Sequence, residues 1–182
     1  MTINEDKIKQ ATRKWLETIV IDLNLCPFAK KEYLNRRVRF SVSSAESQER
    51  LLQDLVIELA LLNKHPEFET TLLITPKSLQ DFDTYNQFLN FTDALLVQMK
   101  LEGVFQIASF HPDYQFAGTL GTDVENYTNR SPYPMLHILR EASVQAVIEA
   151  YPNTEQIPKD NIQQMHALGL SHMKQLLGDC HL

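Results

Sequence analysis

Three short segments with the residue pattern of β-strands alternate along this chain with segments of helical periodicity. The strand candidates are TTLLITP, VFQIASF and RVRFSVSS, and in the last of these Val38, Phe40 and Val42 alternate to one face. Strands that alternate with helices are typical of α/β folds. Because single-helix crossovers are right-handed, they place the connected strands parallel in one sheet. We therefore expect an α/β fold with a small, mostly parallel sheet flanked by about five helices.

The first two helices are predicted from apolar residues at helical spacing. The chain opens with an amphipathic helix that should end before Pro27, because a proline disfavours helical geometry in its predecessor. Ser43 and Glu46 predict a capping box at the start of the second helix. The apolar residues are Ile8, Ala11, Trp15, Leu16, Ile19 and Leu23 in the first helix, and Leu51, Leu52, Leu55, Val56, Leu59 and Leu62 in the second.

Three further helices are predicted in the rest of the chain. One runs over residues 78–99. Another begins at Ser131 as N-cap with Pro132 at the first helical position, and stops near Tyr151 and Pro152. Pro158 opens the last helix. The segment DYQFAGTLGT could add another strand. The helix after Ser131 is expected to bury Met135, Ile138, Leu139, Ala142 and Ala146.

The bulk properties indicate one globular domain over residues 1–182. The chain has 17 basic and 23 acidic residues and a net charge of −6, which argues against nucleic acid as a partner. Cys26 and Cys180 are too few and too far apart for a disulfide framework. The sequence shows neither a signal peptide nor an apolar run of membrane-spanning length, so we expect a cytoplasmic protein without a membrane partner. Cys180 and His181 are expected in a frayed C-terminal tail.

The segment HPDYQFAGTLGTDVENYTNR, residues 111–130, is the predicted functional loop. It is much longer than the usual connection of about 4–6 residues, and long ordered loops are commonly functional. His111 leaves a strand at its carboxyl end, where α/β sheets bind ligands, and is the best-placed general acid or base. Asp113 would orient the imidazole. The alternative is that His111 and Asp113 only close a turn around Pro112.

Arg130 and Ser131 are the predicted anion-binding residues of this loop. The guanidinium would lie beside the N-terminus of the expected Ser131 helix, and both features favour a carboxylate or phosphate. The alternative is an internal ion pair between Arg130 and Asp123 or Glu125. Further substrate contacts are expected from Tyr114, Tyr127 and Gly118.

Cys26 has two interpretations. It follows the first helix, whose C-terminal dipole disfavours a thiolate, so a small buried residue is the default. The other interpretation places it beside His111, as a nucleophile or, with His111 and Asp113, as a metal ligand. The sequence does not place the two side chains together, and no motif specifies a cofactor or an oligomeric state.

Three blocks of the chain resemble an uncharacterised bacterial family, domain of unknown function 1415. They are LNLCPFAK, EGVFQIASFHPDYQFAG and DVENYTNRSPYPMLHILREASV. The resemblance covers nearly the whole chain and implies a single-domain bacterial protein. It carries no activity, cofactor or catalytic residue.

Three functions are compatible with these residues. The favoured one is an enzyme that acts on a small anionic substrate, with His111 as acid or base, Asp113 as its orienter and Cys26 as a possible nucleophile. The second is metal binding by His111, Cys26 and Asp113. The third is a non-catalytic binding module whose recognition surface is formed by Tyr114, Phe116, Tyr127 and Tyr133.

Overall fold

A mixed four-stranded sheet forms the centre of the computed structural model, which describes residues 4–150 and 153–181. The strand order is β1-β2-β4-β3. β1 and β2 are parallel, whereas β4 is antiparallel to both β2 and β3. The three predicted strands are confirmed, but the expectation of a mostly parallel sheet is wrong. The strands are β1 (Val38–Val42), β2 (Thr70–Ile74), β3 (Phe105–Phe110) and β4 (Met135–Arg140).

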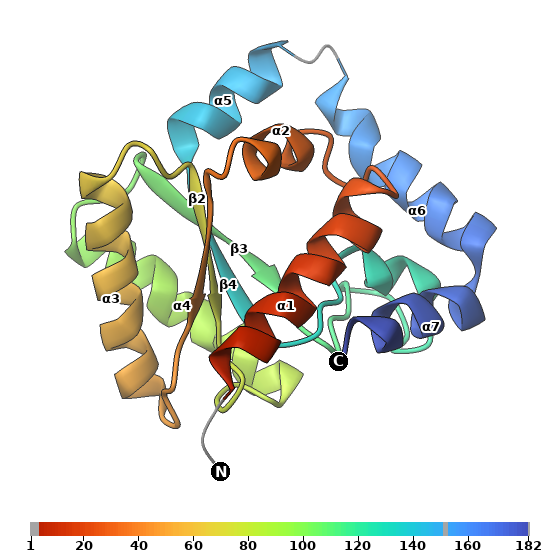
Figure 1. Ribbon diagram of the computed structural model, residues 1–182, viewed down its shortest axis with the longest axis horizontal. Coiled ribbons are helices and arrows are strands. Elements are labelled where there is room, and N and C mark those ends of the chain that lie inside the picture. The colour runs from red at the N-terminus through yellow and green to blue at the C-terminus, as the bar shows by residue number, and fades with distance from the viewer. Residues whose placement is uncertain (1–3, 151–152, 182) are drawn as a thin grey trace.

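Helices cover both faces of this sheet (Figure 1). α3 and α4 lie on one face, and α1, η1, α6 and α7 lie on the other. The α-helices are α1 (Glu5–Trp15), α2 (Ala29–Leu34), α3 (Gln48–Lys64), α4 (Phe82–Gln98), α5 (Glu141–Ala150), α6 (Ile157–Leu168) and α7 (Leu170–Cys180). Three shorter helical segments are η1 (Leu16–Ile21), a π-helix, and η2 (Val124–Thr128) and η3 (Thr154–Gln156), which are 3₁₀-helices.

The main correction to the sequence prediction concerns residues 131–140, which form a bend at Pro132 and Tyr133 followed by β4 instead of a helix. Ser131 does not cap a helix. Its hydroxyl instead donates to the carbonyl of Tyr133 at 2.7 Å. β4 pairs with strands on both sides, and the helix begins only at Glu141. The predicted end of this helix, near residues 151–152, lies outside the described part of the chain.

Smaller corrections concern helix starts and ends. Ser47 is the N-cap of α3, while Ser43 instead donates its hydroxyl to Asp54 at 2.6 Å. Asp81 caps α4, which therefore starts later than residue 78. Gly169, at φ +79°, separates α6 from α7 within the segment expected as one helix. Residues 113–122, the segment DYQFAGTLGT, add no strand.

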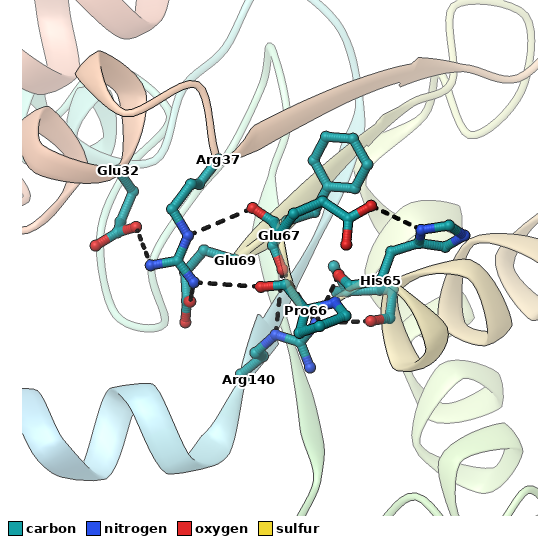
Figure 2. A network of polar contacts seen from close by, with 9 residues as sticks. Glu32, Arg37, His65, Pro66, Glu67, Glu69 and Arg140 are labelled. Atoms are coloured by element: carbon teal, nitrogen blue, oxygen red, sulfur yellow. Dashed lines mark hydrogen bonds and ion pairs between the residues drawn. The ribbon is translucent and has the colours of Figure 1, made fainter.

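Two arginines hold the connection between α3 and β2 (Figure 2). Arg140, at the end of β4, donates to the carbonyls of Leu62, His65 and Phe68. Arg37 pairs with Glu69 at 2.6 Å and with Glu32 at 3.1 Å. Phe68 and Glu69, the last two residues before β2, are thereby held in place. This clamp positions Thr70, the first residue of β2.

Candidate functional site

His111 lies directly after β3 with its side chain fully buried. Its ring packs between Phe82 and Tyr85 of α4, with ring centroids at 5.3 and 5.1 Å. Nε2 lies 3.0 Å from the carbonyl oxygen of Leu79, and Nδ1 accepts the backbone N–H of Asp113 at 3.0 Å. Both ring nitrogens are therefore occupied by backbone groups.

These two bonds determine the protonation state of His111. A carbonyl can only accept, so Nε2 carries the proton, and Nδ1 must offer its lone pair to the N–H of Asp113. Burial lowers the pKa of the imidazole, against smaller opposing effects that include the bond to Leu79 and the charges of Asp113 and Asp81. Asp113 is exposed, and its carboxylate has no hydrogen bond within residues 4–150 and 153–181. A neutral, fully bonded ring has no free site for proton transfer, so this geometry supports the turn-closing interpretation of His111.

Arg130 is bound inside the loop. Its Nε donates to the carbonyl of Tyr114 at 3.2 Å, and Nη2 donates to the carbonyl of Gly121 at 2.7 Å. The guanidinium carbon lies 4.7 Å from the centre of the Tyr127 ring. With no helix starting at Ser131, the predicted anion pocket lacks its helix dipole. Arg130 instead ties the two ends of the segment 114–121 together.

Asn126 provides the second tie within the loop. Its side chain is fully buried and accepts the N–H of Phe116 and the hydroxyl of Thr119, at 3.0 and 2.9 Å. Its amide nitrogen donates to the carbonyl of Leu120 at 2.7 Å. Gly118 has φ +83°, a conformation that side chains other than glycine's rarely adopt. The loop is thus held by its own polar side chains and by ring contacts of Tyr114 with Phe82 of α4 and with Phe116.

Replacing Arg130 with lysine should loosen this loop. A lysine cannot reproduce the two-pronged contact to the Tyr114 and Gly121 carbonyls, so we expect a loss of about 1–2 kcal/mol in the free energy of unfolding. Amide hydrogen exchange should speed up within residues 114–121. Arg36→Lys is the matched control, because Arg36 is exposed and its side chain has no hydrogen bond within the described ranges. Unchanged exchange in Arg130→Lys would contradict the role of Arg130 as a tie.

Cys26 lies apart from His111. It belongs to the turn between η1 and α2 and packs against the core on the α1 side of the sheet. The ring of His111 instead packs against α4, on the other face. Within residues 4–150 and 153–181, no group of three His, Cys, Asp or Glu side chains is arranged to hold a metal ion. His111, Asp113 and Cys26 therefore do not converge.

The C-terminal segment is docked, contrary to the expected frayed tail. Cys180 is fully buried in the core on the α1 side, and burial raises the pKa of its thiol. The ring of His181 lies 5.6 Å from that of Tyr133. A shallow cavity of about 400 Å³ lies beside this end of α7. It is lined by Lys14, Thr18, Leu176, Gly178, Asp179 and His181, and the Lys14 amine donates to the carbonyl of Asp179.

His137 is a functional candidate that the sequence prediction did not select. It lies on β4, on the sheet face that packs against α1, and its Nε2 is 2.7 Å from the hydroxyl oxygen of Thr70. That hydroxyl donates to the carbonyl of Ile138 at 2.6 Å, so Nε2 must be the donor to Thr70. Nδ1 of this neutral ring has no partner within the described residues, and the side chain is partly exposed. Burial lowers the pKa of the imidazole to about 4.

The neighbours of His137 on this face of the sheet come from β3. Ala108 of β3 lies directly opposite in the antiparallel pairing, and Phe110 contributes a ring at 5.9 Å. Gln106 lies two residues before Ala108 and therefore on the same face. Gln106 also lines a groove of about 410 Å³ between the start of β3 and α5, together with Gly103, Glu141, Ala142, Val144, Gln145 and Ile148.

The sequence did contain a signal for this position. MLHIL is a short apolar run bounded by Pro134 and Arg140, which is the pattern of a buried strand. In a strand, Met135, His137 and Leu139 share one face. Assigning the run to a helix hid this alternation.

Comparison with known proteins identifies the family alone. The family model described as "Protein of unknown function (DUF1415)" matches residues 7–175. No curated protein and no solved structure matches the chain. Among residues 4–150 and 153–181, none of the helices combines the length and apolar character needed to cross a bilayer. Since the match spans nearly all of the sequence, the chain belongs to this family of proteins of unknown function.

Proposed function

We propose that the chain is a small-molecule-binding protein whose ligand contacts His137 and occupies the groove between β3 and α5. The observation that carries the proposal is the free Nδ1 of His137. Thr70 fixes the proton on Nε2, so Nδ1 is held as a hydrogen-bond acceptor on a partly exposed stretch of the sheet. Binding sites commonly combine apolar walls with a few such placed polar groups.

The chemistry of the groove favours an uncharged or cationic ligand that carries N–H or O–H donors. Its polar lining is Gln106, Glu141 and Gln145, and it contains no lysine or arginine. A carboxylate or phosphate would meet the charge of Glu141 without a compensating cation. We expect a donor group of the ligand to pair with Nδ1 of His137, whose imidazole stays neutral at physiological pH because its pKa is about 4. The same low pKa makes the imidazole a weak base, so the proposal is binding and not proton transfer.

A ligand screen followed by NMR tests the proposal. Two fragment libraries of equal size would be used, one of neutral amides, alcohols and aminoheterocycles, the other of carboxylates and phosphates. Neutral fragments should shift the ¹⁵N signal of His137 Nδ1, and His137→Gln should weaken their binding at least about tenfold, the loss expected for one buried hydrogen bond. His172→Gln, at an exposed histidine, is the matched control.

The same screen separates this proposal from the enzyme suggested by the sequence. An anionic substrate handled by His111 and Arg130 would give hits from the carboxylate and phosphate library, with shifts at residues 111–130 and none at His137. Neutral hits that bind His137→Gln as tightly as the unaltered protein would also contradict a site at His137.

A further inference from the structure

β3 is an edge strand with an uncharged sequence. It ends the strand order, so within residues 4–150 and 153–181 it pairs with β4 alone. From Val104 to Phe110 the chain reads VFQIASF, which has no charged residue and no proline. Edge strands are commonly protected from pairing with other chains by charges, prolines or bulges. β3 has none of these.

The backbone bonds around β3 show which of its groups face outward. Val104 accepts the N–H of Glu141, which extends the ladder with β4, so residues 104, 106, 108 and 110 direct their backbone groups toward β4. Residues 105, 107 and 109 therefore face away from the sheet. Two of their outward groups are already used, because the Phe105 N–H donates to Leu101 and the Ser109 carbonyl accepts from Asn129.

Four outward groups remain without a partner within the described ranges: the carbonyl of Phe105, the N–H and carbonyl of Ile107, and the N–H of Ser109. This set is self-complementary. If a second copy of β3 lies antiparallel with Ile107 opposite Ile107, the two isoleucines exchange both of their bonds. Each Ser109 N–H then meets the Phe105 carbonyl of the other copy. All eight free groups of two chains are satisfied by four hydrogen bonds.

From this pattern we propose that two copies of the chain associate through β3, across a two-fold axis at Ile107, into one continuous eight-stranded sheet. An isologous contact of this kind closes on itself and stops at a dimer. The opposite edge does not offer the same contact, because β1 carries Arg39 and is preceded by Arg36 and Arg37.

Exposed apolar side chains adjoin the proposed contact. Val104, just before β3, is 39% exposed, and Ile148 of α5 is 47% exposed on the wall of the groove beside β3. α5 buries none of its residues although it is largely apolar. In the proposed register the Val104 side chain of each copy lies opposite Phe110 of the other copy, and Phe110 is partly exposed. The association does not depend on the ligand proposed above, because it uses backbone groups on the outer edge.

Charge substitution at Gln106 tests the pairing. In the proposed register Gln106 lies opposite Ala108 of the second copy, and the two Gln106 side chains are diagonal neighbours roughly 7–8 Å apart. Gln106→Lys and Gln106→Glu should each weaken the dimer at least about tenfold through like-charge repulsion. An equimolar mixture of the two variants should restore it as a heterodimer. Gln106 is partly exposed, and only its side chain changes, so the ladder with β4 is retained.

Sedimentation velocity, run from low to high micromolar protein concentration, measures the mass of the assembly. The unaltered protein should reach twice the 21.0 kDa mass of the chain. Circular dichroism would confirm that each variant is folded, and Gln175→Lys and Gln175→Glu, at an exposed position of α7, are the matched controls. A monomer at every concentration overturns the proposal, and so does a dimer that Gln106→Lys and Gln106→Glu leave equally strong. Because the readout is mass, neither outcome bears on ligand binding at His137.

Discussion

His111→Ala is expected to lower the free energy of unfolding by about 2–4 kcal/mol, the cost of a buried cavity together with two backbone groups, one buried and one part-buried, that lose their partner. Those groups are the carbonyl of Leu79 and the N–H of Asp113. Leu79 has φ +59°, a strained conformation for a residue with a side chain, and its carbonyl is held by the imidazole. Loss of that bond also removes a restraint on the connection between β2 and α4. Chemical denaturation followed by circular dichroism would measure the change.

The control is His172→Ala. His172 is exposed, and its side chain has no hydrogen bond within residues 4–150 and 153–181, so a change of less than about 0.5 kcal/mol is expected. An unaltered free energy of unfolding in His111→Ala would show that the ring is not structural, and would return His111 to the list of candidate acids and bases.

The second large effect is a loss of stability between pH 6.5 and pH 5 that depends on His137. Its pKa is about 4 in the folded protein, against about 6.5 in an unfolded chain. Above pH 6.5 both states are neutral and the full stability is present. As the pH falls through this window, the unfolded state takes up a proton that the folded state does not. The free energy of unfolding should therefore fall by up to about 2 kcal/mol across it.

Comparison with His137→Gln isolates this contribution. The glutamine amide can still donate to Thr70 but does not titrate, so the slope of stability against pH should flatten. His111, whose pKa is also lowered by burial, contributes a slope of the same sign in both proteins. His172→Gln, at an exposed histidine, is the matched control. A ring that titrates near pH 6.5 by NMR, or an unchanged slope in His137→Gln, would contradict a lowered pKa of His137 in the folded protein.

The elements that sequence reasoning identified correctly are those whose local pattern agrees with their tertiary environment. β2 is an example, because TTLLI is buried at every position and is bounded by Pro76. α1 and η1 are another, since Ile8, Trp15 and Ile19 recur at helical spacing and all lie in one core.

β4 was missed because local signals and tertiary pairing disagree. Ser131 and Pro132 have the local chemistry of a helix start, but the following residues fill the gap between β2 and β3. Pairing on both sides satisfies the backbone of residues 135–140 in a way that local propensity does not reveal. Because of this error, Arg130 was assigned to the N-terminus of a helix that is not formed there. The position of His137 on one face of a strand was not recognised for the same reason.

The hydrogen-bond partners of His111 and Arg130 in the long loop were equally unpredictable from the sequence. An internal ion pair of Arg130 was one of the two interpretations of this residue, with Asp123 or Glu125 as the acceptor. The acceptors are the carbonyls of Tyr114 and Gly121. Every residue carries a carbonyl, so the sequence does not identify which one a guanidinium will reach. Likewise, the bonds that neutralise His111 come from backbone atoms of Leu79 and Asp113, which no side-chain pattern reports.

The position of β4 has a consequence for synthesis on the ribosome. The strand that joins the two halves of the sheet is the last of the four to be translated. β1 and β2 can pair with each other as soon as residue 74 has emerged, whereas β3 has no neighbour until Arg140 follows. Assembly of the sheet thus waits for long-range contacts, which slow folding. Until then the nascent chain exposes the unpaired sides of β2 and β3, so interception by chaperones would matter most in that interval.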